Sequence, residues 1–378
     1  MIGKGPEQRG TVWVAVRIPD NCIACHANQS RIHQFDLKDK KNVRYSKDVI
    51  SFARQRGYFS GKDADFSFAD AYAPADFGAI RYCEARVWSF YNRWVEGMDK
   101  YLDYVDGKHI GKASPMPLYF EPKQKLSLHD VMNSMRDHFE GTPFDVTQDV
   151  GAGPYNAPYR PTPLSWEYKG KRYFNERPIS TQQTAGTYVI QVRDFLPNAV
   201  GGVLWFGNDD PNMVPYTPVY CSATKAPECY DPKDADGVTF SWNSAFWVQN
   251  WVANMTYPRY SQLFPGLEAA RQELEDAYAA RQASVEKQAV ELLRYDADRA
   301  AAYLTDYSAE CARQMMERWT RLGQYLIVKY NDQTVKPEKD GQFERTPEGL
   351  GARPARPGFN DNYKEVIIRE TGDKYLVP

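Results

Sequence analysis

The sequence lacks several patterns that would assign a function directly. No apolar run approaches the roughly 20 residues that a membrane-spanning helix needs, so we predict no membrane partner. The formal net charge is -2, which argues against nucleic acid as a partner. The motifs H-E-x-x-H and G-x-S-x-G and the glycine-rich phosphate loop are all missing. These absences exclude several common classes of hydrolase and nucleotide-binding protein.

Histidine and cysteine are scarce. The five histidines show no metal-ligand spacing, and we predict neither a metal ion nor another cofactor. Six cysteines are too few for a disulfide scaffold. The segment Cys22-Ile-Ala-Cys25-His26 fits the spacing for haem attachment or for a redox pair, but no matching axial ligand is evident. We interpret Cys22 and Cys25 as buried cysteines of a strand, and Asp209-Asp210 as a turn.

Aromatic residues, in contrast, are plentiful. The sequence contains 26 Tyr, 18 Phe and 9 Trp. Such side chains build cores and also line clefts that bind small organic ligands. The composition therefore favours a binding protein or an enzyme without choosing between them. The first residues, Met1 to Pro6, contain no apolar segment typical of a signal peptide, and they predict no localisation.

Hydrophobic periodicity predicts strands, then helices, then strands, then helices. The predicted strands cover 11–18, a hairpin at 166–174 that turns at Lys169-Gly170, and 188–192, 202–206 and 216–220. The predicted helices are a short one capped by Ser46, one carrying Ile80 to Trp94, one from Ser127 through Phe139, one at 242–255, and two long helices carrying 274–292 and 304–326. A last edge strand is predicted at 364–370. This order predicts an α+β fold.

Three regions follow from this pattern. We predict a main domain over residues 1–260 and a helical hairpin packed on it over 261–330. Residues 331–378 are rich in Pro, Gly and charge, and are predicted to form an extended C-terminal segment that ends in the edge strand.

Two polar segments stand next to apolar strands. The first is His26-Ala-Asn-Gln-Ser-Arg31, after the early strand, and the second is Arg177 to Thr184, before the strand at 188–192. Amide and hydroxyl groups at strand ends supply hydrogen-bond donors to a cleft, but they also cap strands and satisfy buried backbone. The residue types serve both roles, and both interpretations stay open at this point.

The same segments belong to an ordered series of blocks. The series comprises Arg17-Ile-Pro-Asp20, His26-Ala-Asn-Gln29, Arg136 to Pro143, Arg177-Pro-Ile-Ser-Thr-Gln-Gln183, Gly201 to Gly207 and Phe240 to Trp247. Together these blocks resemble the secernin-related family of cysteine dipeptidases, over most of the chain. Six ordered blocks are far more specific than one short motif.

The resemblance implies an N-terminal-nucleophile hydrolase fold, layered αββα, and hydrolysis of dipeptides without a metal. In that family an N-terminal cysteine attacks the peptide carbonyl and its own α-amine acts as the base. Residue by residue, Asn28 matches an asparagine expected to donate its amide to the oxyanion. The resemblance also implies that a further set of polar residues contacts the substrate, namely His26, Gln29, Arg31, Arg177, Thr181, Gln182 and Gln183.

The sequence departs from the family at the nucleophile. The family's cysteine lies well upstream of the block matching Arg17 to Asp20, and Cys22 and Cys25 have no free α-amine. We therefore expect the fold to be incomplete at the N-terminus and the chain alone to be inactive. Unpaired sheet edges and exposed apolar faces should then make it poorly soluble.

Three further points stay open from the sequence. The chain could instead serve another amide hydrolase of the same fold class, or it could be a non-catalytic binding protein on that fold. A homo-oligomer is compatible with either.

Overall fold

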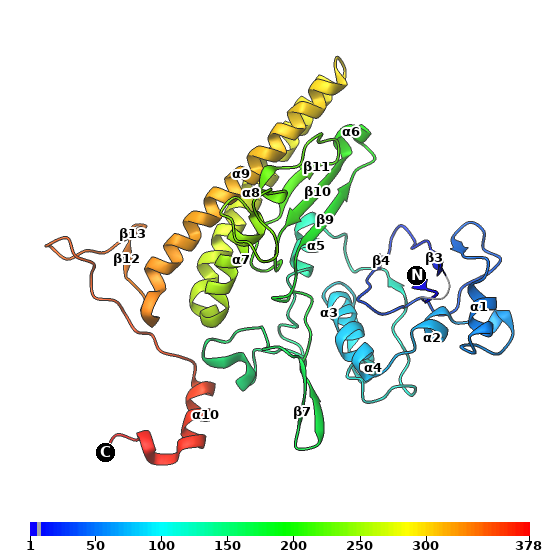
Figure 1. Cartoon of the computed structure of the whole chain (residues 1–378), viewed down its shortest axis with the longest axis horizontal. Coiled ribbons are helices and arrows are strands. Elements are labelled where there is room, and N and C mark those ends of the chain that lie inside the picture. Colours follow the sequence, from blue (N-terminus) through cyan, green and yellow to red (C-terminus); the bar gives the residue numbers. More distant parts are fainter. Residues whose placement is uncertain (6–8) are drawn as a thin grey trace. The chain divides into compact units, whose positions relative to one another are not determined.

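The computed structural model describes residues 1–5 and 9–378. Contacts divide the chain into two units. The first unit comprises Met1–Ser127 with Asn175–Pro178, and the second comprises Leu128–Phe174 with Ile179–Pro378. Both contain helices and small antiparallel sheets, so the predicted α+β class is confirmed (Figure 1). No helix within the described ranges has the length and apolar character needed to cross a membrane.

The first unit is built from short elements joined by long loops. Its strands are β1 (Ile2–Gly3), β2 (Thr11–Val12), β3 (Val14–Val16), β4 (Ile23–Ala24), β5 (Val43–Tyr45) and β6 (Tyr119–Phe120). Its helices are α1 (Val49–Gln55), α2 (Phe68–Tyr72), α3 (Ala85–Trp94) and α4 (Leu102–Val105), with the 3-10 turns η1 (Asp63–Asp65) and η3 (Met98–Tyr101) and the π-helix η2 (Ala79–Glu84).

The strands of this unit pair antiparallel in twos, β1 with β2, β3 with β5, and β4 with β6. Each ladder has only two or three residues per strand, so it contributes few hydrogen bonds. One apolar cluster lies under α1, and it includes Val12, Phe52 and Phe68. Further along, α3 buries Val87, Trp88 and Tyr91, which fixes the helix that borders the loop after β4.

The second unit contains the longest elements. Its strands are β7 (Ser165–Tyr168), β8 (Lys171–Phe174), β9 (Thr187–Val192), β10 (Gly202–Gly207), β11 (Thr217–Tyr220), β12 (Glu338–Lys339) and β13 (Gln342–Phe343). Its helices are α5 (Leu128–Ser134), α6 (Asn198–Gly201), α7 (Ala245–Thr256), α8 (Tyr260–Leu293), α9 (Ala297–Tyr330) and α10 (Asp361–Thr371). Its 3-10 turns are η4 (Val150–Tyr155), η5 (Glu228–Tyr230), η6 (Tyr257–Arg259), η7 (Asn331–Gln333) and η8 (Gly372–Tyr375).

The core of this unit lies between a three-stranded sheet and the helices α7, α8 and α9. The sheet order is β11-β10-β9, all antiparallel, and α8 and α9 form the predicted long hairpin (Figure 1). Trp205 of β10, Tyr278 of α8 and Trp319 of α9 are almost completely buried. These apolar faces account for the strand and helix periodicity in the sequence.

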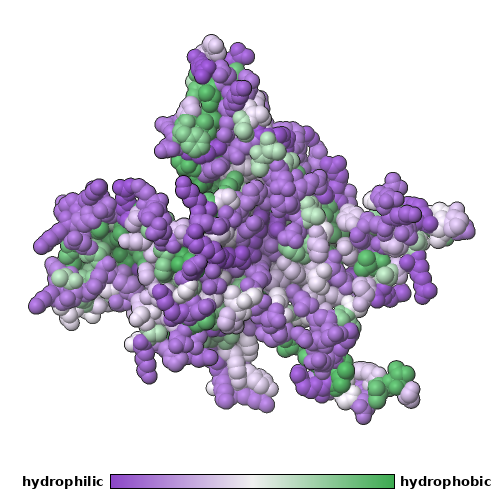
Figure 2. Space-filling model, turned by 180° about the vertical axis from the view of Figure 1, so that it is seen from behind, coloured by the Kyte–Doolittle hydropathy of each residue, from purple (hydrophilic) through white to green (hydrophobic). Residues whose placement is uncertain are grey.

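One face of the same sheet remains exposed. Tyr188, Ile190 and Val192 alternate with inward residues along β9, and their relative exposures are 61%, 59% and 78%. Tyr188 pairs with Phe206 of β10, and Ile190 pairs with Leu204. Figure 2 shows green hydrophobic areas within a mostly hydrophilic surface. An antiparallel sheet with solvent on one face normally carries polar residues there, so this face is unusually apolar.

Several predicted elements are confirmed. The hairpin β7–β8 turns at Lys169 and Gly170, and both have positive φ, 49° and 72°. Two consecutive residues with positive φ match the twist that two-residue hairpins prefer. The strands near 188–192, 202–206 and 216–220, the helix near 242–255 and both long helices are also present.

Other predictions about single elements are wrong. The edge strand predicted at 364–370 is the helix α10, because the Asn360 side chain caps its start by accepting a hydrogen bond from Tyr363 N (2.8 Å). The helix predicted to run through Phe139 ends at Ser134, and Phe139 itself has φ 65°. The first short helix has Asp48, not Ser46, at its N-cap position, and the Asp48 side chain makes no capping hydrogen bond.

Candidate functional site

The loop after β4 carries the asparagine predicted to bind an oxyanion. Asn28 is exposed and has φ 57°, a left-handed conformation that asparagine tolerates better than most residues. The preceding Ala27 is buried, and Gln29 donates its side-chain amide to the carbonyl of Ala73. The loop therefore anchors the residues on both sides of Asn28 and leaves the Asn28 side chain at the surface.

Arg31 lies at the end of this loop and holds it in place. Its guanidinium is buried and forms an ion pair with Glu84, with Nε to Oε1 at 2.9 Å. The remaining donors bind four main-chain oxygens, those of Cys25, Met116, Pro117 and Leu118. Because these contacts engage its donors, Arg31 fixes the loop to the segment before β6 rather than pointing to solvent.

A second residue at the base of the loop is Tyr91 of α3. Its hydroxyl accepts a hydrogen bond from the Cys25 backbone N–H (2.9 Å) and donates one to the Leu118 carbonyl (2.8 Å). Burial raises the pKa of Tyr91, so this hydroxyl stays protonated and keeps its donor role. Arg31 and Tyr91 thus bind the same two segments.

Asn28 receives its own partner from the start of α3. Arg86 donates from Nη2 to Asn28 Oδ1 at 2.9 Å. Since a guanidinium only donates, this contact assigns the oxygen of the Asn28 amide and turns its NH₂ group away from Arg86. Among the described residues, no acceptor binds that NH₂ group. The arrangement presents a free, oriented amide donor.

Arg86 is not among the site residues predicted from the sequence. It lies two residues after Glu84, where the π-helix η2 runs into α3, so one helical turn brings Glu84 to Arg31 and Arg86 to Asn28. Segments of π-helix are frequent at functional sites. No short motif marks the position, and only the contact across 58 residues reveals it.

Arg177 belongs to the same unit through the segment Asn175–Pro178. The neighbouring Glu176 forms an ion pair with Arg81 of η2, and both side chains are largely buried. Arg177 therefore lies near the helix that carries Arg86. Burial, and then the positive charge of Arg177, lowers the pKa of Arg86, whereas burial raises the pKa of Cys83 against a smaller opposing effect of Arg177. Arg177 thus belongs to the unit that carries Asn28, and it is close enough to Arg86 for the two charges to interact.

His26 is exposed, and its side chain makes no hydrogen bond to any described residue. Partial desolvation of the ring, followed by the charge of Arg31, lowers the pKa of His26. The imidazole is therefore neutral near pH 7.

The other predicted contacts lie in the second unit. Thr181 is buried, Gln182 is half-buried with its amide 3.5 Å from the Arg160 carbonyl, and Gln183 is exposed. The residue before them, Ser180, donates its hydroxyl to Asp210. Their predicted substrate contacts remain predictions.

Asp209 and Asp210 form a buried polar centre in the second unit, which the interpretation as a simple turn did not anticipate. Both are completely buried. Asp210 also accepts a hydrogen bond from Tyr257 OH (3.1 Å), and Asp209 accepts one from Asn250 Nδ2 (3.0 Å). Burial, with the charge of Asp210, raises the pKa of Asp209 to about 7.

Four thiols are poorly suited to act as nucleophiles. Burial raises the pKa of Cys25 to about 11, that of Cys229 to about 12 and that of Cys311 to about 11, and it raises the pKa of Cys83 as well. Since the thiolate is the reactive form, these cysteines are mostly unreactive near neutral pH. Cys22 and Cys25 are only partly buried, so the interpretation of both as buried strand residues is wrong.

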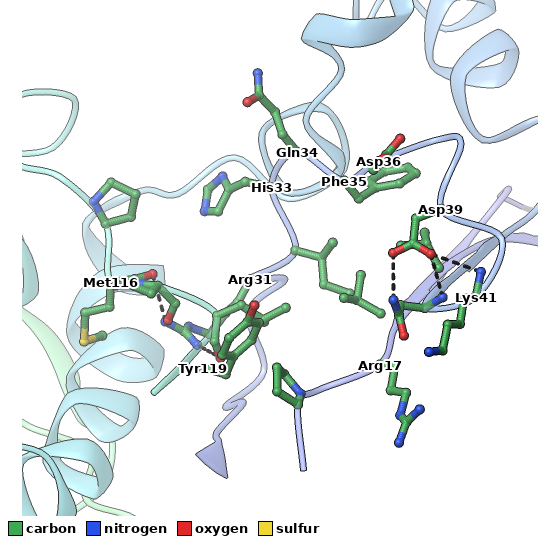
Figure 3. Close-up of a pocket in the computed structure, with 18 of the residues that line it drawn as sticks. Arg17, Arg31, His33, Gln34, Phe35, Asp36, Asp39, Lys41, Met116 and Tyr119 are labelled. Atoms are coloured by element: carbon green, nitrogen blue, oxygen red, sulfur yellow. Dashed lines mark hydrogen bonds between the residues drawn. The ribbon is translucent and has the colours of Figure 1, made fainter. Parts of the chain in front are cut away.

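A cavity of the first unit lies on another side of Arg31. It has a volume of about 760 Å³, and of the predicted site residues only Arg31 lines it. Figure 3 shows Arg31 beside Met116 and Tyr119, with Asp39 and Lys41 across the cleft. Within residues 1–5 and 9–378, no three His, Cys, Asp or Glu side chains are grouped to hold a metal ion.

Comparisons with known proteins give one consistent result. The model of a family described as Peptidase family C69 matches residues 1–273. A "Probable dipeptidase" from Salmonella dublin is 28% identical over 228 residues, which is 60% of this chain and 45% of that protein. A "Probable dipeptidase" from Latilactobacillus sakei is 25% identical over 320 residues, 85% of this chain and 60% of that protein. "Dipeptidase A" from Lactobacillus helveticus is 23% identical over 256 residues, 66% and 46% respectively. The chain spans about half the length of these relatives.

Proposed function

The chain belongs to peptidase family C69, and from this premise we propose that it forms part of a dipeptidase that acts through a cysteine acyl-enzyme. The names of its relatives, dipeptidases in each case, support the substrate class. The observation that carries the proposal in this chain is the Asn28 amide, which is exposed and oriented by Arg86. A donor held in place before the reaction is what a developing oxyanion requires.

In this proposal the nucleophile comes from outside the chain. The reaction needs a thiolate, and in the N-terminal-nucleophile mechanism the same cysteine supplies its α-amine as the base. Burial keeps four thiols of this chain protonated, and each of its six cysteines has its α-nitrogen in a peptide bond. The chain then contributes Asn28 and the groups around it.

The layered αββα arrangement is part of the same proposal. The exposed face of β9 and β10 carries Tyr188, Ile190 and Val192, and a second sheet would cover it. Two sheets that pack face to face bury apolar inner surfaces in this way. A covering sheet would also bury side chains that now cost free energy in water.

The proposal is tested by kinetics on the whole protein that carries this sequence. Asn28→Asp keeps the shape of the side chain but replaces the amide donor with a carboxylate. We expect kcat for L-alanyl-L-alanine to fall roughly 10²- to 10³-fold with little change in KM, because the donor acts mainly on the oxyanion. Released amino acids are measured, and Asn21→Asp, on the exposed turn before β4, is the matched control.

The origin of the nucleophile is tested on the 378-residue chain alone. We expect it to bind dipeptides without hydrolysing them. Turnover by the chain alone that iodoacetamide abolishes would show that one of its own thiols is the nucleophile, and would contradict this part of the proposal. Unchanged kcat in the Asn28→Asp protein would contradict the oxyanion role itself.

A further inference from the structure

Two guanidinium groups of the first unit, that of Arg86 in contact with Asn28 and that of Arg177 after the Arg81–Glu176 ion pair, have no acidic partner among the described residues. Arg86 donates from Nε to the Tyr82 carbonyl and from Nη2 to Asn28 Oδ1. Its Nη1 has no hydrogen-bond partner in the part of the chain that the structure describes. Within the same residues, no carboxylate forms an ion pair with Arg86 or with Arg177. Both side chains are half-buried, so solvent reaches them.

Other arginines of the same region do have carboxylate partners. Arg81, one turn earlier on η2, is neutralised by Glu176, and Arg31 is neutralised by Glu84. The ion pair of Glu176 holds the next residue, Arg177, near the helix of Arg86. Burial and then the charge of Arg177 lower the pKa of Arg86. Two neighbouring cations repel each other, and an anion bound between them would relieve this repulsion.

A dipeptide carries such an anion at a fixed place. Its scissile carbonyl carbon and its C-terminal carboxylate carbon are separated by three bonds, roughly 4 Å. A site for the oxyanion must therefore lie next to a site for the carboxylate. Asn28 and Arg86 are in direct contact, which meets this requirement. Guanidinium groups also match the planar geometry of a carboxylate.

We propose that Arg86 and Arg177 bind the free C-terminal carboxylate of the dipeptide, beside the Asn28 amide that faces its scissile carbonyl. This inference rests on the proposed function. It also explains a preference for dipeptides, since a longer peptide has a neutral peptide bond where the site requires a carboxylate. Arg86 has a second task, because its contact with Asn28 Oδ1 orients the amide.

The large cleft of Figure 3 is the competing location. Its cations Arg17 and Lys41 lie among the acidic residues Asp20, Asp36 and Asp39, and Arg17 already pairs with Asp20 at 2.9 Å. These carboxylates would repel the C-terminus of a peptide. Arg86 and Arg177, in contrast, form no ion pair with a carboxylate among the described residues.

The test compares two probes on the full 378-residue chain, L-alanyl-L-alanine and its C-terminal amide, by isothermal titration calorimetry. We expect the wild-type chain to bind the free carboxylate about tenfold or more tightly than the amide, as a charge-assisted contact implies. Arg177→Gln should lose about tenfold for the dipeptide and little for the amide. Arg86→Gln should behave likewise, and Arg86→Lys should recover part of the loss.

Arg17→Gln is the matched control, since it removes a cation from the large cleft. Equal affinity of the wild-type chain for both probes, or unchanged affinity in Arg177→Gln, would overturn the carboxylate site while dipeptide binding itself stands. A loss confined to Arg17→Gln would assign the carboxylate to the cleft and overturn it too. If neither probe binds the wild-type chain, the proposed function fails and the carboxylate site with it. Arg177 is half-buried and makes no hydrogen bond to a described residue, so its variant tests the site even where Arg86→Gln unfolds.

Discussion

The first unit positions the loop after β4 with one buried ion pair, whereas the second unit places its polar segment on a large apolar core. In the first unit, Arg31 pairs with Glu84 and binds four main-chain oxygens. In the second, Ser180 binds Asp210 beside strands whose inner face is filled by Trp205 and its neighbours.

The difference follows from the length of the elements. Strands of two or three residues provide few ladder hydrogen bonds, so a charged side chain with many donors fixes the loop instead. The long helices and the six-residue strands of the second unit bury a larger apolar surface, and the buried ion pair of that unit, Arg136 with Glu275, adds to this core. We infer that the loop geometry of the first unit depends on single residues far more than that of the second.

Removal of one acid in each unit should give the largest effect and test this comparison. Glu84→Gln leaves Arg31 buried and unpaired, and Glu275→Gln does the same to Arg136. We expect each to lower the free energy of unfolding by roughly 3–5 kcal/mol in urea denaturation. Only Glu84→Gln should also weaken binding of L-alanyl-L-alanine, because only that change frees the loop of Asn28.

Glu317→Gln is the control, since its partner Arg313 is exposed and such pairs contribute about 1 kcal/mol or less. Intact dipeptide binding in Glu84→Gln would show that the loop keeps its geometry without the ion pair. A weakened binding in Glu275→Gln would show that the two units do not differ in the way we infer.

The buried acid of the second unit predicts an intermediate effect that depends on pH. Asp209 has its pKa raised from 3.8 to about 7, so between these values the folded chain holds a proton that the unfolded chain releases. The free energy of unfolding should therefore fall as pH rises from about 4 to about 7, by up to about 4 kcal/mol from this group. Asp209→Asn should flatten this part of the profile.

The measurement is urea denaturation of both proteins at several pH values across that range. Asp236→Asn is the control. Asp236 is exposed, and the hydrogen bonds that it accepts, the largest effect being that from Val238 N, lower its pKa. Asp236 therefore titrates below this pH window. Parallel profiles of the wild-type and Asp209→Asn proteins would contradict the assignment of the slope to Asp209.

The smallest expected effect concerns the helical hairpin. The Asp296 side chain accepts hydrogen bonds from Asp298 N and Arg299 N, both at 3.0 Å, and so caps α9. Asp296→Ala should lower the free energy of unfolding by about 1 kcal/mol and leave dipeptide binding unchanged. Asp306→Ala, at an exposed position inside the same helix, is the control. A change in binding would mean that the second unit shapes the site more directly than we infer.

Local patterns account for what the sequence alone determined. Alternation along β9 and the apolar run of β10 predicted these strands, and spacings of three and four predicted α8 and α9, because side-chain period follows directly from backbone geometry. The polar segment around Asn28 was also predicted, from its place after a strand and from the family blocks.

Only the tertiary structure decided which groups meet. Arg31 is buried in an ion pair with Glu84, which lies 53 positions later in the chain. Arg86 orients Asn28, which lies 58 positions earlier. Both contacts form because η2 and α3 pack against the loop after β4. Asp209 is buried because Asn250 and the core around it cover it. The helix α10 forms where a last edge strand was predicted, since Asn360 caps it. Charge pairing and burial depend on distance in space, and no short period in the sequence encodes that distance.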